Sequence, residues 1–99
     1  MNSNLNSPKI TLHATRRMKS RLKLSGAKKQ SLHVSIVWKD GIKEDQITNE
    51  KLENFLLDKG TDNVKIIYDG YLYIFGRNSH RLITLYPLSQ ELLEELNND

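Results

Sequence analysis

The stretch VKIIYDGYLYIF, residues 64–75, decides how the chain folds. Two runs of β-branched and aromatic residues flank Asp69-Gly70. This dipeptide between apolar strands is a strong signature of a β-hairpin with a two-residue type I′ turn. Such a turn places Tyr68 opposite Tyr71 and fixes the register of the whole pair.

A third strand, residues 81–86, follows the polar turn at 76–80, and Pro87 ends it. Side chains alternate between the two faces of a strand, so one face of this meander is predicted to be apolar and to pack on helices. That face holds Ile67, Leu72, Ile74, Ile83 and Leu85. The opposite face is predicted to be more open and aromatic, with Tyr68, Tyr71, Tyr73, Thr84 and Tyr86.

Helical patterns lie on both sides of the hairpin. Thr11 is a suitable N-cap for a first helix that ends at Ser25-Gly26. Residues 27–39 fit both a strand and a helix, and we favour a helix with Gly41 as its left-handed C-terminal cap.

Two shorter helices complete the pattern. Leu52, Phe55 and Leu56 predict a short third helix that closes at Lys59-Gly60, and Ser89 can cap a last helix at 90–96. The order predicts an α+β fold, with N-terminal helices packed on a three- to four-stranded antiparallel meander and a short C-terminal helix.

A chain of 99 residues has room for one domain. We expect it to span residues 10–96, with a loose N-terminal arm at 1–9 and a frayed tail at 97–99. Cysteine is absent, and the three histidines lack metal-ligand spacing, so we expect neither a metal nor a cofactor. No apolar run resembles a signal peptide or a membrane span, which predicts a soluble cytoplasmic protein.

The charges are unevenly distributed along the chain. Residues 1–39 hold nine Lys or Arg and no acidic residue, whereas residues 40–99 hold six Lys or Arg and twelve Asp or Glu. A basic segment of this density favours polyanions, among which nucleic acid competes with anionic membranes and acidic proteins.

Histidine and arginine recur every four residues in the first helix. His13, Arg17 and Arg21 would form one stripe with Arg16 beside it. Arginines can hold a phosphate by forked hydrogen bonds, and a histidine among them can accept a proton. The plainer interpretation is a solvated basic helix face, and spacing alone favours it.

Other residues could contact nucleic acid. Tyrosines such as Tyr71 and Tyr73 can stack nucleobases on an open sheet, although they are equally typical strand formers. The remaining candidates are cations and a turn histidine, which is more often a plain loop residue: Lys28, Lys29, Arg77, His80 and Arg81.

The run ITLHATRRMKSRL, residues 10–22, resembles the "I-x-x-H-A-x-x-R-x-x-x-R-L" opening of small bacterial and phage proteins. YDGYLYIF at 68–75 and LITLYPL at 82–88 are similar to their endings. We associate this group with the barnase, EndoU, colicin and RelE-like ribonuclease superfamily. The resemblance covers most of residues 10–88, and the middle, 27–62, matches only in outline.

The resemblance implies a toxin-like domain that cleaves RNA without a metal, by attack of the ribose 2′-OH on the adjacent phosphorus. His13 would be the general base or acid and Arg17 and Arg21 the phosphate clamp, while Thr84 and Tyr86 would position the scissile phosphate. The expected partner is RNA or another nucleic acid, and a ribosome, an antitoxin or another host nucleoprotein could also bind, whereas no membrane partner is expected.

Two alternatives need no catalysis. The chain could be an accessory protein of a phage or mobile element that binds nucleic acid or inhibits a host nucleoprotein. It could also form a homodimer in which acidic and basic segments of two copies pair.

Overall fold

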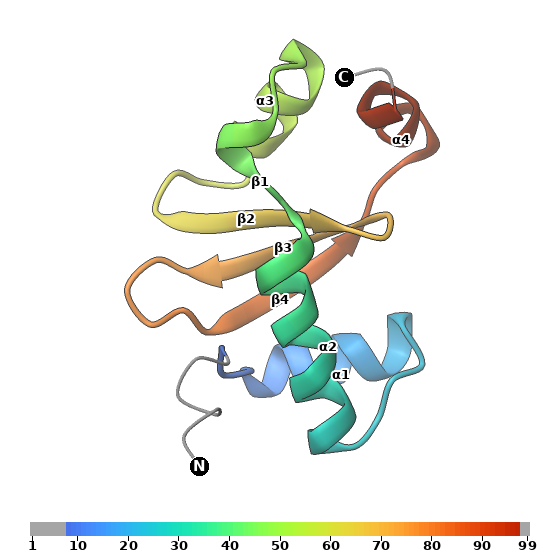
Figure 1. Cartoon of the computed structure of the whole chain (residues 1–99), viewed down its shortest axis with the longest axis vertical. Coiled ribbons are helices and arrows are strands. Elements are labelled where there is room, and N and C mark those ends of the chain that lie inside the picture. Colours follow the sequence, from blue (N-terminus) through green and yellow to red (C-terminus); the bar gives the residue numbers. More distant parts are fainter. Residues whose placement is uncertain (1–7, 98–99) are drawn as a thin grey trace.

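The structure is a computed structural model that describes residues 8–97, and it confirms the α+β fold (Figure 1). Four antiparallel strands form one sheet in the order β1-β2-β3-β4. The elements along the chain are α1 (Leu12–Arg21), α2 (Ala27–Asp40), β1 (Ile42–Lys43), the 3-10 helix η2 (Glu44–Gln46), α3 (Glu50–Leu57), β2 (Asn63–Tyr68), β3 (Tyr71–Gly76), β4 (Leu82–Pro87) and α4 (Gln90–Asn97).

The hairpin that decides the fold is formed by β2 and β3 in the predicted register. Tyr68 pairs with Tyr71, and the pairing continues to Asn63 and Gly76. Asp69 and Gly70 both have positive φ values, +47° and +82°, as a type I′ turn requires. The local sequence therefore fixes the register of the two central strands.

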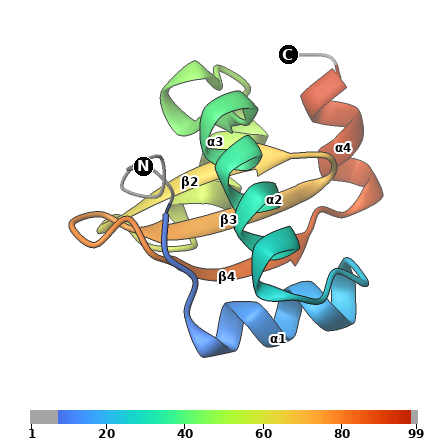
Figure 2. The ribbon, with the colours of Figure 1, turned by 60° about the horizontal axis from the view of Figure 1, so that its bottom comes forward.

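Helices cover both faces of this sheet, with α1 and α2 on one side and α3 and α4 on the other (Figures 1 and 2). We call these the α1–α2 layer and the α3–α4 layer. The core under α1–α2 contains Ala14, Met18, Val34, Val37, Ile66, Tyr73, Phe75, Leu82 and Leu85. The core under α3–α4 contains Ile47, Leu52, Leu56, Ile67, Leu72, Ile74, Leu88 and Leu92.

The predicted open aromatic face is wrong in two respects. Helices α1 and α2 cover it, so Tyr73 is only 1% exposed. Thr84 and Tyr86 lie on the opposite face, because they pair with Ile74 and Leu72. The turn between β3 and β4 and a shift of register at Ile74/Phe75 set this pairing, and a simple period of two along β4 misses both.

The expected apolar face is corrected by the same register. Leu85 pairs with Tyr73 and lies in the core under α1–α2. Ile83, which was expected to pack on helices, is 42% exposed beside the register shift. The remaining members of that predicted face do pack under α3 and α4.

The predicted helices all form, and of the three caps that the sequence predicts, the one at Gly41 differs. Thr11 caps α1 by accepting from the Ala14 N–H, and Ser89 Oγ accepts from the Leu92 N–H at the start of α4. Gly41 is not a left-handed cap, since its φ is −69°. The chain instead turns directly into β1, and a Cβ at Gly41 would collide with Ile66 and lie 2.7 Å from the Val37 carbonyl oxygen.

The predicted N-terminal arm is shorter than expected, because residues before α1 already pair with β4. The Leu82 N–H donates to the Lys9 carbonyl at 2.7 Å, and the Thr11 N–H donates to the Leu82 carbonyl at 3.0 Å. The rest of the predicted arm, 1–7, and residues 98–99 of the predicted tail lie outside the described residues. Asn97 is the last residue of α4.

Within residues 8–97 we find no helix with the length and apolar character needed to cross a membrane.

Candidate nucleic-acid interface

Helix α1 lies along β4 and presents its predicted stripe outside the core. Ala14 and Met18 are fully buried against the sheet, which fixes the rotation of the helix. His13 and Arg16 are therefore exposed, and Arg17 is half-buried between them and the sheet. The helical spacing thus gives the surface that the sequence predicts.

The structure brings His13 and Arg17 into contact. The Arg17 Nε–H donates to His13 Nε2 at 3.3 Å, one helical turn away. This contact leaves the proton of a neutral His13 ring on Nδ1, because Nε2 acts as the acceptor. The pair can hold an anion from the arginine side, and Nε2 becomes a free proton acceptor if Arg17 turns away.

Arg21, the third member of the stripe, is tied to the sheet. One of its guanidinium nitrogens donates to the Leu85 carbonyl, and its own carbonyl accepts from the Tyr71 hydroxyl at 3.3 Å. β4 is the last strand in the sheet order, so a group on α1 satisfies an acceptor there. Arg21 therefore has a structural task besides its charge.

Tyr86 lies between two cations. The Arg21 guanidinium carbon is 5.9 Å from the centre of its ring, and Lys59 Nζ is 4.9 Å from it. Both separations suit cation–π attraction. Lys59 was not among the predicted site residues, because 27 positions of sequence separate it from Tyr86 and no local pattern connects the two.

Thr84 does not join this group. Its side chain is 8% exposed and lies on the sheet face that α3 and α4 cover. The five residues that the catalytic prediction names are therefore divided. His13 contacts Arg17, Arg21 reaches Tyr86 around β4, and Thr84 is withdrawn from the surface.

The predicted stacking tyrosines have internal partners. The Tyr73 hydroxyl lies 2.7 Å from His33 Nε2 beneath α2, and burial raises its pKa well above the usual value. Burial also lowers the pKa of His33, and the negative charge of Asp69 opposes part of that shift. Tyr71 is half-buried. Tyr73 is thus a core residue and not a platform for bases.

The other predicted contacts lie at two places on the surface. Lys28 and Lys29 are exposed on the first turn of α2. Arg77, His80 and Arg81 are exposed in the turn between β3 and β4, where Arg77 donates to the Asn63 carbonyl at 3.0 Å.

The charge asymmetry of the sequence becomes an asymmetry across the sheet. Helices α1 and α2 carry seven Lys or Arg and one Asp, whereas α3 and α4 carry five Glu and one Lys. Figure 1 shows the sheet between α1 and the α3–α4 pair. Among the described residues, no ion pair involves a cation of α1 or α2.

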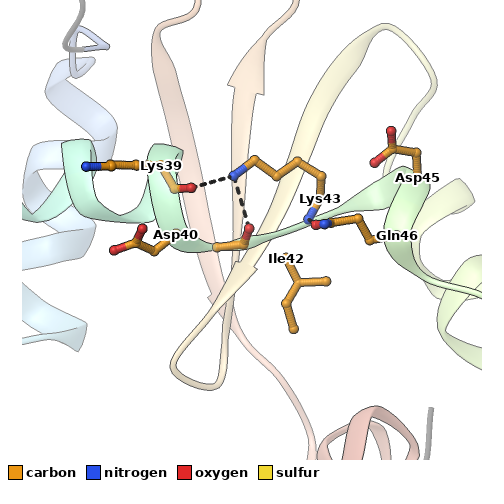
Figure 3. A pocket seen from close by; sticks show the side chains of 7 residues that line it. Lys39, Asp40, Ile42, Lys43, Asp45 and Gln46 are labelled. Carbon is orange, nitrogen blue, oxygen red and sulfur yellow. Dashed lines mark hydrogen bonds between the residues drawn. The ribbon is translucent and has the colours of Figure 1, made fainter.

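One hollow, of about 480 Å³, lies where α2 passes into β1 and η2 (Figure 3). Two lysines and two aspartates line it, so it has no excess of positive charge. Lys43 Nζ donates to the Lys39 carbonyl at 3.2 Å and to the Gly41 carbonyl at 3.0 Å, which satisfies the end of α2. This hollow therefore offers little to a phosphate.

In the part of the chain that the structure describes, no group of three or more His, Asp or Glu is placed to hold a metal ion.

No family model matches the chain, and no curated protein or solved structure matches it significantly.

Proposed function

We propose that the protein binds RNA through the cationic surface of the α1–α2 layer. One observation carries the proposal, which is that seven Lys or Arg gather on two helices with no ion-pair partner among the described residues. Surface cations without ion-pair partners attract a flexible polyanion and release its counterions on binding. A ribosome, or another host nucleoprotein that exposes RNA, would be a partner of this kind, and an antitoxin would be a protein that covers the same surface.

The test is the salt dependence of binding to a single-stranded oligoribonucleotide. Arg17→Gln removes one cation from the α1–α2 layer, and we expect it to weaken binding and to reduce the slope of log K against log salt by about 0.7. Lys51→Gln is the matched control, because it removes one cation from the α3–α4 layer. We expect its slope to equal that of the wild type.

Two results would contradict the proposal. The first is an absence of binding to RNA at low salt. The second is an equal loss in Arg17→Gln and Lys51→Gln, which would show a response to net charge alone. Anionic vesicles without RNA serve as a second probe, and a stronger response to them would favour a membrane surface.

A second candidate function, RNA cleavage, is favoured by the contact between His13 and Arg17. In this proposal Arg17 turns from His13 to a non-bridging phosphate oxygen, and His13 Nε2 takes the proton of a ribose 2′-OH. The 2′ oxygen then bonds to phosphorus and the bond to the 5′ oxygen breaks. A water molecule protonates that oxygen as it leaves, and the proton held by His13 neutralises the hydroxide that remains. The product is a 2′,3′-cyclic phosphate.

Cleavage is tested by incubating RNA with the protein in excess EDTA, beside His13→Ala and Arg17→Ala. We expect a cyclic phosphate product with the wild type and at least a hundredfold slower reaction with His13→Ala. If RNA is bound but stays intact, or if both variants cleave at the wild-type rate, the catalytic proposal is wrong. Binding without cleavage would favour the accessory-protein alternative.

A further inference from the structure

A short series of aromatic rings leads from the core to the surface near the end of α2. The ring of buried Phe75 lies 4.8 Å from the ring of Trp38, edge on at 74°. Trp38 also contacts His80, whose ring lies 5.1 Å from it at 45°. Trp38 is half-buried and His80 is exposed, so the series ends in a ring that solvent reaches.

The backbone holds His80 in an uncommon conformation. Its φ is +54°, in the left-handed region that most L residues avoid. The His80 N–H donates to the Gly76 carbonyl at 3.0 Å, and the Gly76 N–H donates to the Arg81 carbonyl at 2.9 Å. These bonds tie the turn together, and with His80 in this conformation its imidazole lies against the indole.

Each of the two ring residues has a cation as its next neighbour in the sequence. Arg81 follows His80 directly and is exposed, and Lys39 follows Trp38 directly and is also exposed. The same turn is joined to the start of α1, because Leu82 exchanges backbone hydrogen bonds with Lys9 and Thr11. An aromatic surface beside positive charge is what proteins use to hold single-stranded nucleic acid, with rings stacking on bases and cations meeting phosphates.

We propose that Trp38 and His80 form a shelf on which an unpaired nucleobase of RNA stacks, while Arg81 binds the neighbouring phosphate. The inference rests on the proposed RNA binding and assigns its base contact to a place other than the tyrosines of the sheet. Sequence reasoning missed Trp38, because its spacing on α2 marks it as a helix residue and gives no sign of the turn that meets it.

Trp38 is the single tryptophan of the chain, so its fluorescence reports on this place alone. Two probes of equal length are compared, an oligoribonucleotide and a ribose-phosphate oligomer without bases. We expect the first to quench Trp38 and to bind about 5- to 100-fold more tightly than the second, as one or more stacked bases would produce.

Variants of His80 test the shelf without disturbing the core. His80→Asn tolerates the left-handed conformation but has no aromatic ring, so we expect it to lose most of the preference for the base-containing probe. His80→Tyr restores a ring and should restore the preference. Asn78→Ala is the control, an exposed residue of the same turn that should keep the wild-type preference.

The outcomes separate the two proposals. If both probes bind equally and Trp38 fluorescence is unchanged, the shelf is wrong and RNA binding through cations stands. If the base preference is present but His80→Asn keeps it in full, the bases stack elsewhere and the shelf is also wrong. If neither probe binds at low salt, both proposals fail.

Discussion

The two helical layers on either side of the sheet differ in charge, but both pack on the sheet through apolar side chains. The α1–α2 layer carries unpaired cations, whereas the α3–α4 layer is acidic and uses its Lys51 in an ion pair with Glu91 at 2.9 Å. Both layers nevertheless rest on fully buried apolar side chains. Burial of that kind, and not surface charge, supplies most of the folding free energy. Apart from Arg21, which is bonded to the Leu85 carbonyl of β4, the cations of α1 and α2 are therefore not needed to hold their layer on the sheet.

The largest expected effect is the loss of the core beneath the α1–α2 layer. Phe75 is fully buried against Trp38, and we expect Phe75→Ala to lower the free energy of unfolding by about 3–5 kcal/mol. Urea unfolding followed by circular dichroism measures it. Leu57→Ala, at an exposed leucine of α3, is the control and should change the value by less than about 0.5 kcal/mol. Similar losses in both variants would contradict the division between core and surface.

The sequence predicts local features of the fold correctly and fails where distant segments of the chain meet. The type I′ turn at Asp69-Gly70 and the cap at Thr11 are local, since neighbouring residues determine them, and both predictions are confirmed. The face of Thr84 depends on a register shift against β3 that involves residues ten positions apart. Local alternation carries no information on such a shift, so that prediction is wrong.

The candidate site shows the same limit. The spacing of His13 and Arg17 predicts that both lie on one stripe of the helix, and in the structure the two side chains are in contact. The approach of Lys59 to Tyr86 and of His80 to Trp38 joins residues far apart in sequence. These pairs form only when the whole chain packs, and no sequence motif predicts them.

A smaller effect is expected at the joint between the layers, where α2 turns into β1. Gly41 has an ordinary φ of −69°, so Gly41→Ala is opposed by crowding alone, against Ile66 and the Val37 carbonyl. We expect a loss of about 1–3 kcal/mol in unfolding free energy. Gly26→Ala gives the comparison, because Gly26 has φ +97° with no atom within 4 Å of an added Cβ. Its cost is backbone strain of about 1–3 kcal/mol, because φ +97° with ψ 128° is a conformation that essentially only glycine adopts. If Gly41→Ala leaves the unfolding free energy unchanged while Gly26→Ala lowers it, the close approach at Gly41 is unimportant.

The smallest expected effect is a pH dependence that belongs to the α1–α2 layer. Burial beneath α2 lowers the pKa of His33 below its usual 6.5, so the unfolded chain binds a proton there more readily than the folded chain. Stability is therefore full above pH 6.5 and declines as the pH falls below it, by no more than about 1.4 kcal/mol per pH unit for one proton. Urea unfolding between pH 7.5 and 5 measures the decline, and His33→Gln should remove this contribution.

Tyr73→Phe shows whether the decline in stability comes from the burial of His33 or from its contact with the Tyr73 hydroxyl. It removes the hydroxyl that lies 2.7 Å from His33 Nε2 but keeps a ring of similar size in the core. Because burial is the main cause of the lowered pKa, we expect Tyr73→Phe to keep the pH dependence that His33→Gln loses. A wild type and a His33→Gln variant that respond equally to pH would instead place the titrating group elsewhere. The α1–α2 layer would then resemble the α3–α4 layer in lacking a buried histidine that governs its stability.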